Sequence, residues 1–239
     1  MLDINQIISK LILKEDIVLD LLDSSLIESE QLLITYCNQH CFNTLVEDQL
    51  YTNTIADNFE VFVDGYGMIK AYNFLFNTQF NSFNATDLYN KFLILLSQKD
   101  IPVFLIGGKF SDELLENNNQ YNVNIVGYQN GYFELSSIEN IAQKIRKANS
   151  RVVLIGMGVP KQEIFAKKLS EFFTDKLFLC VGNYLEYYLG TSKRIPFFFR
   201  NKGIEWIYRL LQEPKRLWKR YLIGIPLFIF RVLKEKYRK

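Results

Sequence analysis

The chain has 239 residues, 49% of them hydrophobic, which is enough for one large domain with a substantial core, or for one domain and an appendage. Its net charge of +2 conceals an uneven distribution: residues 193–239 carry 14 basic and 3 acidic side chains, whereas residues 1–192 carry 14 basic and 23 acidic ones. Three cysteines (Cys37, Cys41 and Cys180) fit a reducing compartment and argue against a disulfide framework, and the lack of an apolar run of about 20 residues argues against a transmembrane span.

The N-terminal segment is broken by charges and lacks the basic start and apolar run that are typical of a signal peptide. From residue 32 onward, short apolar runs alternate with helical patterns. Several apolar runs show no polar alternation, as expected for strands that are covered on both faces. Strands are predicted at 32–37, 59–64, 102–108, 121–127, 151–158 and 176–182, and helices at 66–76, 86–98, 111–119, 137–148 and 161–173.

This alternation predicts an α/β fold with a Rossmann-like parallel sheet flanked by helices. After the segment LGTSKRIP the pattern changes to helices alone. We therefore expect a Rossmann-like α/β domain at 1–192 and a basic, aromatic helical appendage at 193–239.

Glycine-rich segments follow most of the predicted strands: DGYG, GGK, GYQNGYF, GMGVPKQE and VGN. Ligands of such sheets bind at the carboxyl ends of the strands, where glycine lets the backbone approach closely and helix N-termini attract phosphate. The sequence therefore predicts a phosphate-bearing ligand, often a nucleotide. The candidate contacts from these segments are Gly65, Gly107, Gly108, Gly127, Tyr132, Gly156 and Gly158.

Asp64 ends the run VFVDGYG and so lies at a strand end. One interpretation is a general base, since a carboxylate in the cleft can take a proton from a bound hydroxyl. The other is an N-cap for the helix at 66–76.

The segment GMGVPKQE also has two interpretations. Pro160 is suited to the first turn of a helix, and Lys161, Gln162 and Glu163 would then project from that turn. They either contact the ligand, with Lys161 neutralising phosphate and Gln162 bonding a sugar or base, or they form a solvated helix start.

Several other sites are disfavoured. GGKF lacks the spacing of a P-loop, and GMGVPK lacks the third glycine of the dinucleotide fingerprint, so an NTPase and a dehydrogenase are both poor candidates. CNQHC, which holds the single histidine His40, favours local packing over a metal site because a second ligand pair is missing. No Asp-x-Asp pair occurs, so we expect no metal cofactor and predict that basic residues and helix dipoles offset any diphosphate charge.

The charge of the basic tail suggests an anionic partner. Arg209, Arg216 and Arg220 share one helical face if the helix continues through Pro214, although Pro214 can instead begin a new helix. The tail either packs on the core as a solvated helix or meets anionic lipid headgroups with some arginines turned into the active site. Mixed Trp, Tyr, Arg and Lys followed by LIGIPLFIFRVL favours the membrane interpretation.

Together, DGYG, GGK, GYQNGYF, GMGVPKQE and GTSKRIPFFFRNKGIEWIYRLLQEPKRLWKRYL resemble the WecG/TagA/CpsF glycosyltransferases, glycosyltransferase family 26. The resemblance spans roughly residues 30–222, and its specific parts are PKQE and EWIYRLLQEPKRLWKRY. It implies metal-independent, inverting transfer from a UDP-sugar to an undecaprenyl-diphosphate-linked saccharide. It also implies a role in cell-wall or surface polysaccharide synthesis, such as that of teichoic acid, with N-acetylmannosamine as the favoured donor sugar.

The resemblance also implies roles for individual residues. Asp64 matches the proposed catalytic base, Gln162 a glutamine of the sugar-nucleotide cleft, and Thr35 and Asn38 a Thr and an Asn beside the pocket. In SFNATD, Asp87 is kept, but Ser and Ala replace the Arg and Gly that are usual in the family. The tail matches an appendage that closes over the site, and its candidate catalytic cations are Arg209, Arg216, Lys219 and Arg220.

The implied partners are the UDP-sugar, the lipid-linked acceptor and an anionic membrane surface, on the cytoplasmic, inner face of the bacterial plasma membrane. A homo-oligomer is left open. The alternative is a nucleotide- or nucleic-acid-binding protein that uses the basic tail, although the apolar segment within the tail suits lipid better and we expect no nucleic acid.

Overall fold

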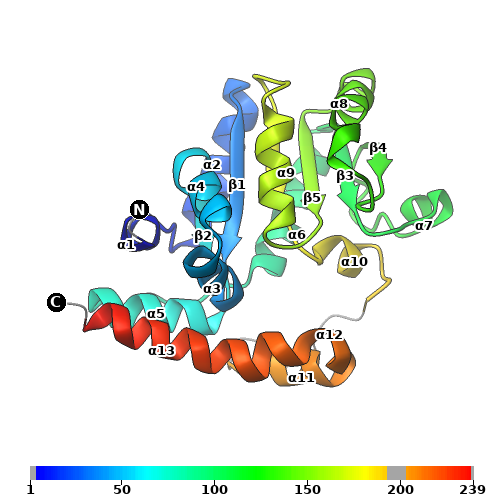
Figure 1. Ribbon diagram of the computed structural model, residues 1–239. Coiled ribbons are helices and arrows are strands. Elements are labelled where there is room, and N and C mark those ends of the chain that lie inside the picture. Colours follow the sequence, from blue (N-terminus) through cyan, green and yellow to red (C-terminus); the bar gives the residue numbers. More distant parts are fainter. Residues whose placement is uncertain (1–3, 193–202, 238–239) are drawn as a thin grey trace.

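The computed structural model describes residues 4–192 and 203–237 and contains one sheet of six parallel strands (Figure 1). The strands lie in the order β2-β1-β6-β5-β3-β4. The predicted Rossmann-like α/β fold is therefore confirmed. The strands are β1 (Leu32–Cys37), β2 (Glu60–Val63), β3 (Val103–Gly107), β4 (Ile125–Gln129), β5 (Val152–Gly156) and β6 (Leu177–Cys180).

Five strands lie within their predicted ranges, and β4 is the exception. It was expected at 121–127 but runs from Ile125 to Gln129. The Asn119 side chain accepts a hydrogen bond from the Val123 N–H at 2.8 Å and donates one to the Val123 carbonyl at 2.7 Å. These local bonds hold the preceding residues in a turn, which competes with the strand that the apolar pattern predicts.

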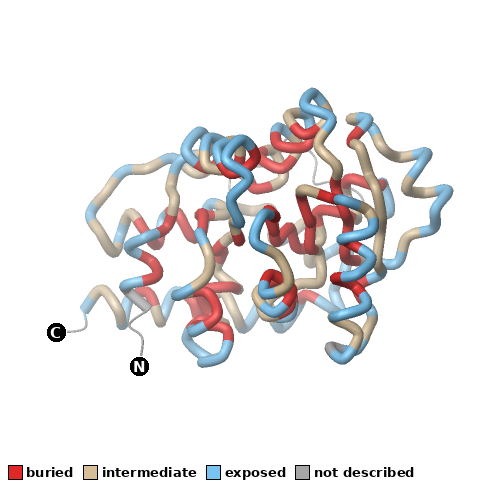
Figure 2. The backbone as a smooth tube through the Cα atoms, turned by 90° about the horizontal axis from the view of Figure 1, so that it is seen from above, coloured by how far each residue is buried: buried red, intermediate tan, exposed pale blue. Residues whose placement is uncertain are grey.

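The sheet is covered on both faces, which explains why its strands read as continuous apolar runs. Along β5, Leu154 packs toward α2 (Glu15–Glu28) and α6 (Ala85–Gln98), whereas Val153 and Ile155 pack toward α8 (Ile138–Lys147) and α9 (Lys161–Ser170). Figure 2 shows the buried residues concentrated in the centre of the molecule, with the exposed ones on the outer helices and loops.

The predicted helix at 66–76 is α5 (Tyr66–Phe76), and those at 111–119 and 137–148 correspond to α7 (Asp112–Asn117) and α8. Five helices were not predicted, although two begin at good capping residues. Asn38 caps α3 by accepting from the His40 and Cys41 N–H groups, and Asp48 caps α4 by accepting from the Tyr51 N–H. The five are α1 (Ile4–Ser9), α2, α3 (Gln39–Glu47), α4 (Gln49–Asn58) and α10 (Tyr184–Tyr188).

The C-terminal segment runs across the edge at which the strands end (Figure 1). It forms α11 (Glu205–Gln212), α12 (Pro214–Trp218), a π-helical turn (Lys219–Ile223) and α13 (Gly224–Lys236). Backbone at Glu213 leaves the helical range, with ψ at 62°, and Pro214 begins α12. One continuous helix through Pro214 is therefore excluded, and the alternative of a new helix is confirmed.

Helix α13 docks on α3 and α5. Its Phe228 and Val232 are buried, and the Phe228 ring meets Phe42 edge to face at 5.1 Å. The Arg231 guanidinium donates to the Asn43 carbonyl at 3.1 Å and pairs with Glu47 at 2.7 Å. The end of the chain thus shares a hydrophobic core with the sheet domain, and the predicted boundary at residue 193 lies outside the described residues.

No helix among the described residues combines the length and the apolar character that crossing a membrane requires.

Candidate active site

A cavity of about 1130 Å³ lies at the carboxyl ends of the strands, between the sheet and the C-terminal helices. Segments that follow all six strands contribute to its wall, as expected for a parallel α/β sheet. They supply Asn38 after β1, Asp64 after β2, Gly108 after β3, Gly131 and Tyr132 after β4, Gly156–Gly158 at the end of β5, and Gly182 and Asn183 after β6. The C-terminal helices supply Trp206, Arg209, Arg216, Arg220 and Tyr221.

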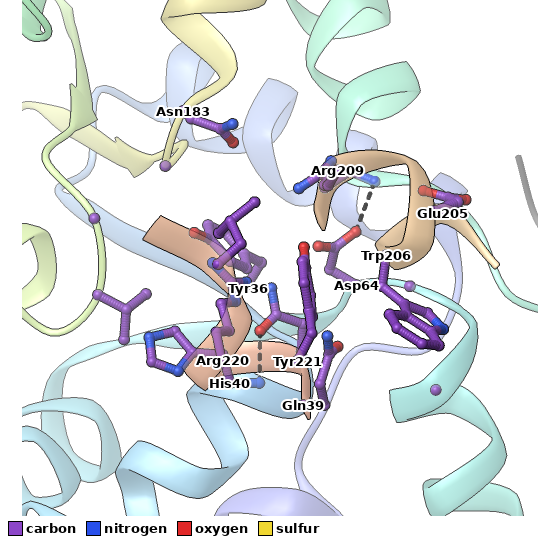
Figure 3. A pocket seen from close by; sticks show the side chains of 18 of the residues that line it. Tyr36, Gln39, His40, Asp64, Asn183, Glu205, Trp206, Arg209, Arg220 and Tyr221 are labelled. Atoms are coloured by element: carbon purple, nitrogen blue, oxygen red, sulfur yellow. Dashed lines mark hydrogen bonds between the residues drawn. The ribbon is translucent and has the colours of Figure 1, made fainter. Parts of the chain in front are cut away.

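Asp64 lies on the cavity wall directly after β2 (Figure 3). Its backbone N–H donates to the Cys37 carbonyl at 2.9 Å, and its Oδ1 accepts from the Ala85 N–H at 3.2 Å. The N-cap of α5 is Gly65, whose φ of 83° favours glycine, and no side chain caps that helix. Asp64 therefore does not cap the helix at 66–76, and its half-buried carboxylate is positioned to accept a proton from a ligand.

Arg209 projects from α11 toward the same space as Asp64 (Figure 3). Its guanidinium lies over the Tyr187 ring, 5.8 Å from the centroid, and its Nε is buried without a hydrogen-bond partner. Burial lowers the pKa of Arg209, but Tyr187, Tyr221 and Asp64 outweigh it and raise the pKa overall. The cavity thus holds a permanent cation beside the carboxylate.

Arg216 and Arg220 also line the cavity, from α12 and the π-helical turn. Arg216 pairs with Glu213 through two bonds of 2.5 and 2.7 Å, and that pairing raises its pKa. The Nε of Arg220 is buried and has no hydrogen-bond partner. The three arginines all line the cavity, but the helix is broken at Glu213 and at the π-helical turn, so they do not share one straight helical face.

Lys219 is placed differently from the three arginines. It is exposed, does not line the cavity, and has its ammonium 5.6 Å from the centroid of the Trp218 ring. In this conformation it is a surface cation.

Gln162 and Glu163 lie at the start of α9, fully buried and behind the cavity wall. Gln162 Oε1 accepts from the Gly182 N–H at 3.0 Å, and its Nε2 donates to Glu163 Oε1 at 2.7 Å. Thr35 in β1 donates to the same oxygen of Glu163 at 2.8 Å. Burial raises the pKa of Glu163 to about 7, against hydrogen bonds that lower it. Thr35, Gln162 and Glu163, which were predicted as ligand contacts, therefore form hydrogen bonds within the protein that stabilise the turn after β6. None of the three faces the cavity.

The other predicted contacts divide into two groups. Asn38, Gly65, Gly108, Tyr132, Gly156, Gly158 and Lys161 line the cavity, whereas Asp87, Gly107, Gly127 and Pro160 do not. A Cβ on Gly107 would come within 2.5 Å of the Gly156 carbonyl oxygen, and one on Gly127 within 2.5 Å of the Phe104 ring. Those two glycines are thus explained by close packing within the protein.

Tyr36, His40 and Tyr221 line the cavity, although the sequence did not single them out as ligand contacts. Tyr36 and His40 could have been recognised from their positions in the sequence, because they lie on either side of Asn38 at a strand end. Burial and the nearby Arg220 lower the pKa of His40 to about 4, so its imidazole is neutral at pH 7. All three cysteines are buried free thiols.

Between residues 4 and 192 and between 203 and 237, no three His, Cys, Asp or Glu side chains are grouped as ligands for a metal ion. The segment CNQHC has a structural role, because the side-chain oxygen Oδ1 of Asn38 caps α3 by accepting from the His40 and Cys41 N–H groups. Independence from metal stays a prediction.

A comparison of the chain with protein families gives a result that is consistent with the geometry of this cavity. The model of the family described as "Glycosyl transferase WecG/TagA/CpsF family" matches residues 7–239, which is nearly the whole chain. That extent includes the sheet, the strand-end cavity and the C-terminal helices. The protein therefore belongs to the WecG/TagA/CpsF glycosyltransferase family, which makes it a glycosyltransferase and supports a role in cell-wall polysaccharide synthesis.

Proposed function

We propose that this glycosyltransferase moves a sugar, with N-acetylmannosamine favoured, from a UDP-sugar to an undecaprenyl-diphosphate-linked saccharide, with inversion and without a metal. The observation that carries the proposal is the joint presence of Asp64 and three arginines on the wall of one strand-end cavity. A carboxylate and fixed cations are what sugar transfer without a metal needs.

UDP lies across the glycine-lined strand ends in this proposal. Gly108, Gly156 and Gly158 expose backbone there, and α9 begins at Lys161, three residues after Gly158. A diphosphate in this position is close to the N-terminus of α9, whose dipole favours an anion, and to the arginines. Exposed Tyr132, on the same wall, is available to cover a bound nucleotide.

In the proposed reaction, Asp64 acts as the base and the arginines stabilise negative charge. Asp64 takes the proton of the acceptor hydroxyl while the oxygen of that hydroxyl attacks the anomeric carbon. The bond from the anomeric carbon to UDP breaks on the opposite face. Inversion results because attack and departure occur on opposite faces. Arg209, Arg216 and Arg220 stabilise the negative charge that develops on the departing UDP or stays on the acceptor diphosphate.

Binding to the inner face of the plasma membrane is part of the proposal. Apolar side chains of the C-terminal helices that do not line the cavity are strongly exposed, among them Leu211 at 77% and Phe230 at 63%. Trp218, Leu222 and Ile223 are also exposed. Lys215 and Lys219 lie beside them in the sequence, and basic residues next to exposed apolar ones suit an anionic lipid surface.

The test is a panel of UDP-sugars offered with a short-chain lipid-diphosphate acceptor, with the product identified by mass. One sugar added to the acceptor, with UDP released, is the expected result. Stabilisation of the protein by UDP but not by single-stranded DNA separates this function from the nucleic-acid alternative. Stabilisation by DNA alone, with no sugar transfer, would refute the proposal.

A further inference from the structure

The cavity does not end at its charged part but continues as an apolar groove between α5 and α13. These two helices contact each other and lie side by side in Figure 1. The groove is lined by one face of each helix, with residues about one turn apart. Its apolar lining includes Gly67, Ala71 and Phe74 from α5 and Ile225, Ile229 and Leu233 from α13, and Lys70 of α5 lines the same stretch.

Several of these side chains are partly exposed. Phe74 is 40% exposed, Ile229 52% and Leu233 44%, although all three line the cavity. On the same helix Phe228 and Val232 are buried and also line the cavity, whereas exposed Phe230 does not line it. Helix α13 therefore presents one apolar side to the core and the groove and another to the outside.

Contacts join the two helices at the far end of the groove. The Lys236 ammonium donates to the Leu75 carbonyl at 3.0 Å and to Asn77 Oδ1 at 2.9 Å. The Tyr237 ring meets the Phe74 ring edge to face at 6.5 Å. These contacts tie the end of α13 to the end of α5, where Phe74 is the last groove residue of α5.

Charge is concentrated at the other end of the groove. Arg209, Arg216 and Arg220 line the part of the cavity that contains Asp64, and α5 begins two residues after Asp64. A cationic chamber that opens into an apolar groove is complementary to an anionic head group bearing a hydrocarbon chain. The charged end suits a diphosphate and the groove suits the chain attached to it.

We infer that the α5–α13 groove binds the first isoprene units of the lipid-linked acceptor, next to its diphosphate. This inference rests on the proposed function. The groove positions run from Gly67 to Phe74 on α5 and from Ile225 to Leu233 on α13, a length of about 10–12 Å, so only the start of a long chain fits and the remainder lies in the membrane. Chain length should therefore matter to the enzyme even in the absence of a membrane.

The experiment compares two soluble acceptors in a vesicle-free assay. Both carry the same saccharide diphosphate, one with a single isoprene unit and the other with three. For the unaltered protein kcat/KM should be at least about tenfold higher with the longer chain, because burial of apolar groups favours binding. The ratio of the two kcat/KM values is the readout.

Two adjacent substitutions on α13 form a matched pair. Ile229→Glu places a carboxylate in the groove and should reduce the ratio to below about threefold, whereas Phe230→Glu makes the same change on the outer side and should preserve the ratio. Stabilisation by UDP checks that each variant is folded, and Ile229→Ala replaces Ile229→Glu if the latter is not.

The inference is overturned if the unaltered protein shows no chain dependence, which would mean that the chain is bound only by the membrane. It is equally overturned if both variants change the ratio to the same extent. Failure of the unaltered protein to glycosylate either acceptor is a different result, and it counts against the proposed function itself.

Discussion

The Gln162 side chain accepts a 3.0 Å hydrogen bond from the Gly182 N–H and thereby joins the start of α9 to the turn after β6. The Glu163 carboxyl holds the other end of that amide at 2.7 Å. Because Gly182 lines the cavity and Gln162 does not, the effect of Gln162 on a ligand is indirect. A residue that matches a ligand contact by family resemblance is here bonded to the protein's own backbone.

Gln162→Ala should therefore reduce both stability and activity. The change leaves the buried Gly182 N–H without its partner, which costs about 1–3 kcal/mol of unfolding free energy. Urea unfolding measures that loss, and kcat/KM should fall with it because the turn is no longer fixed. Lys168→Ala, at an exposed position of the same helix, is the control and should change neither. Lower activity with unchanged stability would point to direct ligand contact instead.

Glu163→Gln should make stability less dependent on pH. Burial raises the pKa of Glu163 to about 7 from its ordinary value of 4.5, so between these values the folded state holds a proton that the unfolded state has lost. The free energy of unfolding of the unaltered protein therefore falls as pH rises through this window, by up to about 3 kcal/mol. Glutamine keeps an oxygen for Thr35 and Gln162 and cannot ionise.

The variant should gain stability relative to the unaltered protein at pH 8 but much less at pH 5, as measured by urea unfolding at both values. Glu139→Gln on the exposed start of α8 is the control and should show no such difference between the two pH values. An equal effect of Glu163→Gln at pH 5 and pH 8 would contradict a raised pKa.

Asp64→Asn should lower kcat by at least about 100-fold while UDP still stabilises the protein. Asparagine keeps an oxygen for the Ala85 N–H but is not a base, so the substitution removes proton transfer and preserves the local structure. Thermal stabilisation by UDP and turnover with saturating substrates are the two measurements. Asp57→Asn, at an exposed position of α4, should leave both unchanged. Retained turnover would remove Asp64 from the mechanism.

Arg209→Ala and Lys219→Ala separate cavity cations from surface cations. Arg209 lies beside Asp64, whereas Lys219 is exposed and packs on Trp218. In a vesicle-free assay the loss of Arg209 should lower kcat/KM about 100-fold, because the charge of the departing group is no longer offset in a partly enclosed site. Lys219→Ala should change it less than about threefold. A comparable loss of kcat/KM in both variants would mean that the C-terminal helices move during the reaction.

His40 should remain neutral throughout the physiological range. Burial and Arg220 lower its pKa to about 4, against an ordinary value of 6.5. The unfolded chain therefore binds a proton between pH 6.5 and 4 that the folded protein does not, and stability falls as pH falls through that window. Because the chain has one histidine, its imidazole NMR signal is unambiguous. Titration of that signal near pH 6.5 in the folded protein would disprove the assignment.

Much of the fold was accessible from residue patterns. Five of the six strands lie within their predicted ranges because doubly covered strands need unbroken apolar runs such as VVLIG in β5. The helices α3 and α4 were missed although each begins at a capping residue, Asn38 and Asp48, because the search for apolar runs gave those residues no weight. In β4, hydrogen bonds from Asn119 outweighed strand propensity, an effect that the apolar pattern does not reveal.

By itself the sequence determined the α/β class, the position of Asp64 at a strand end and the family, because these depend on local patterns and on motifs that are contiguous in the chain. Only the tertiary structure decided which side chains meet. The break at Glu213 and the π-helical turn direct Arg216 and Arg220 into the cavity, and packing of α9 turns Gln162 and Glu163 toward Gly182. The direction of a side chain depends on backbone breaks and on neighbours distant in sequence, and residue spacing alone contains neither.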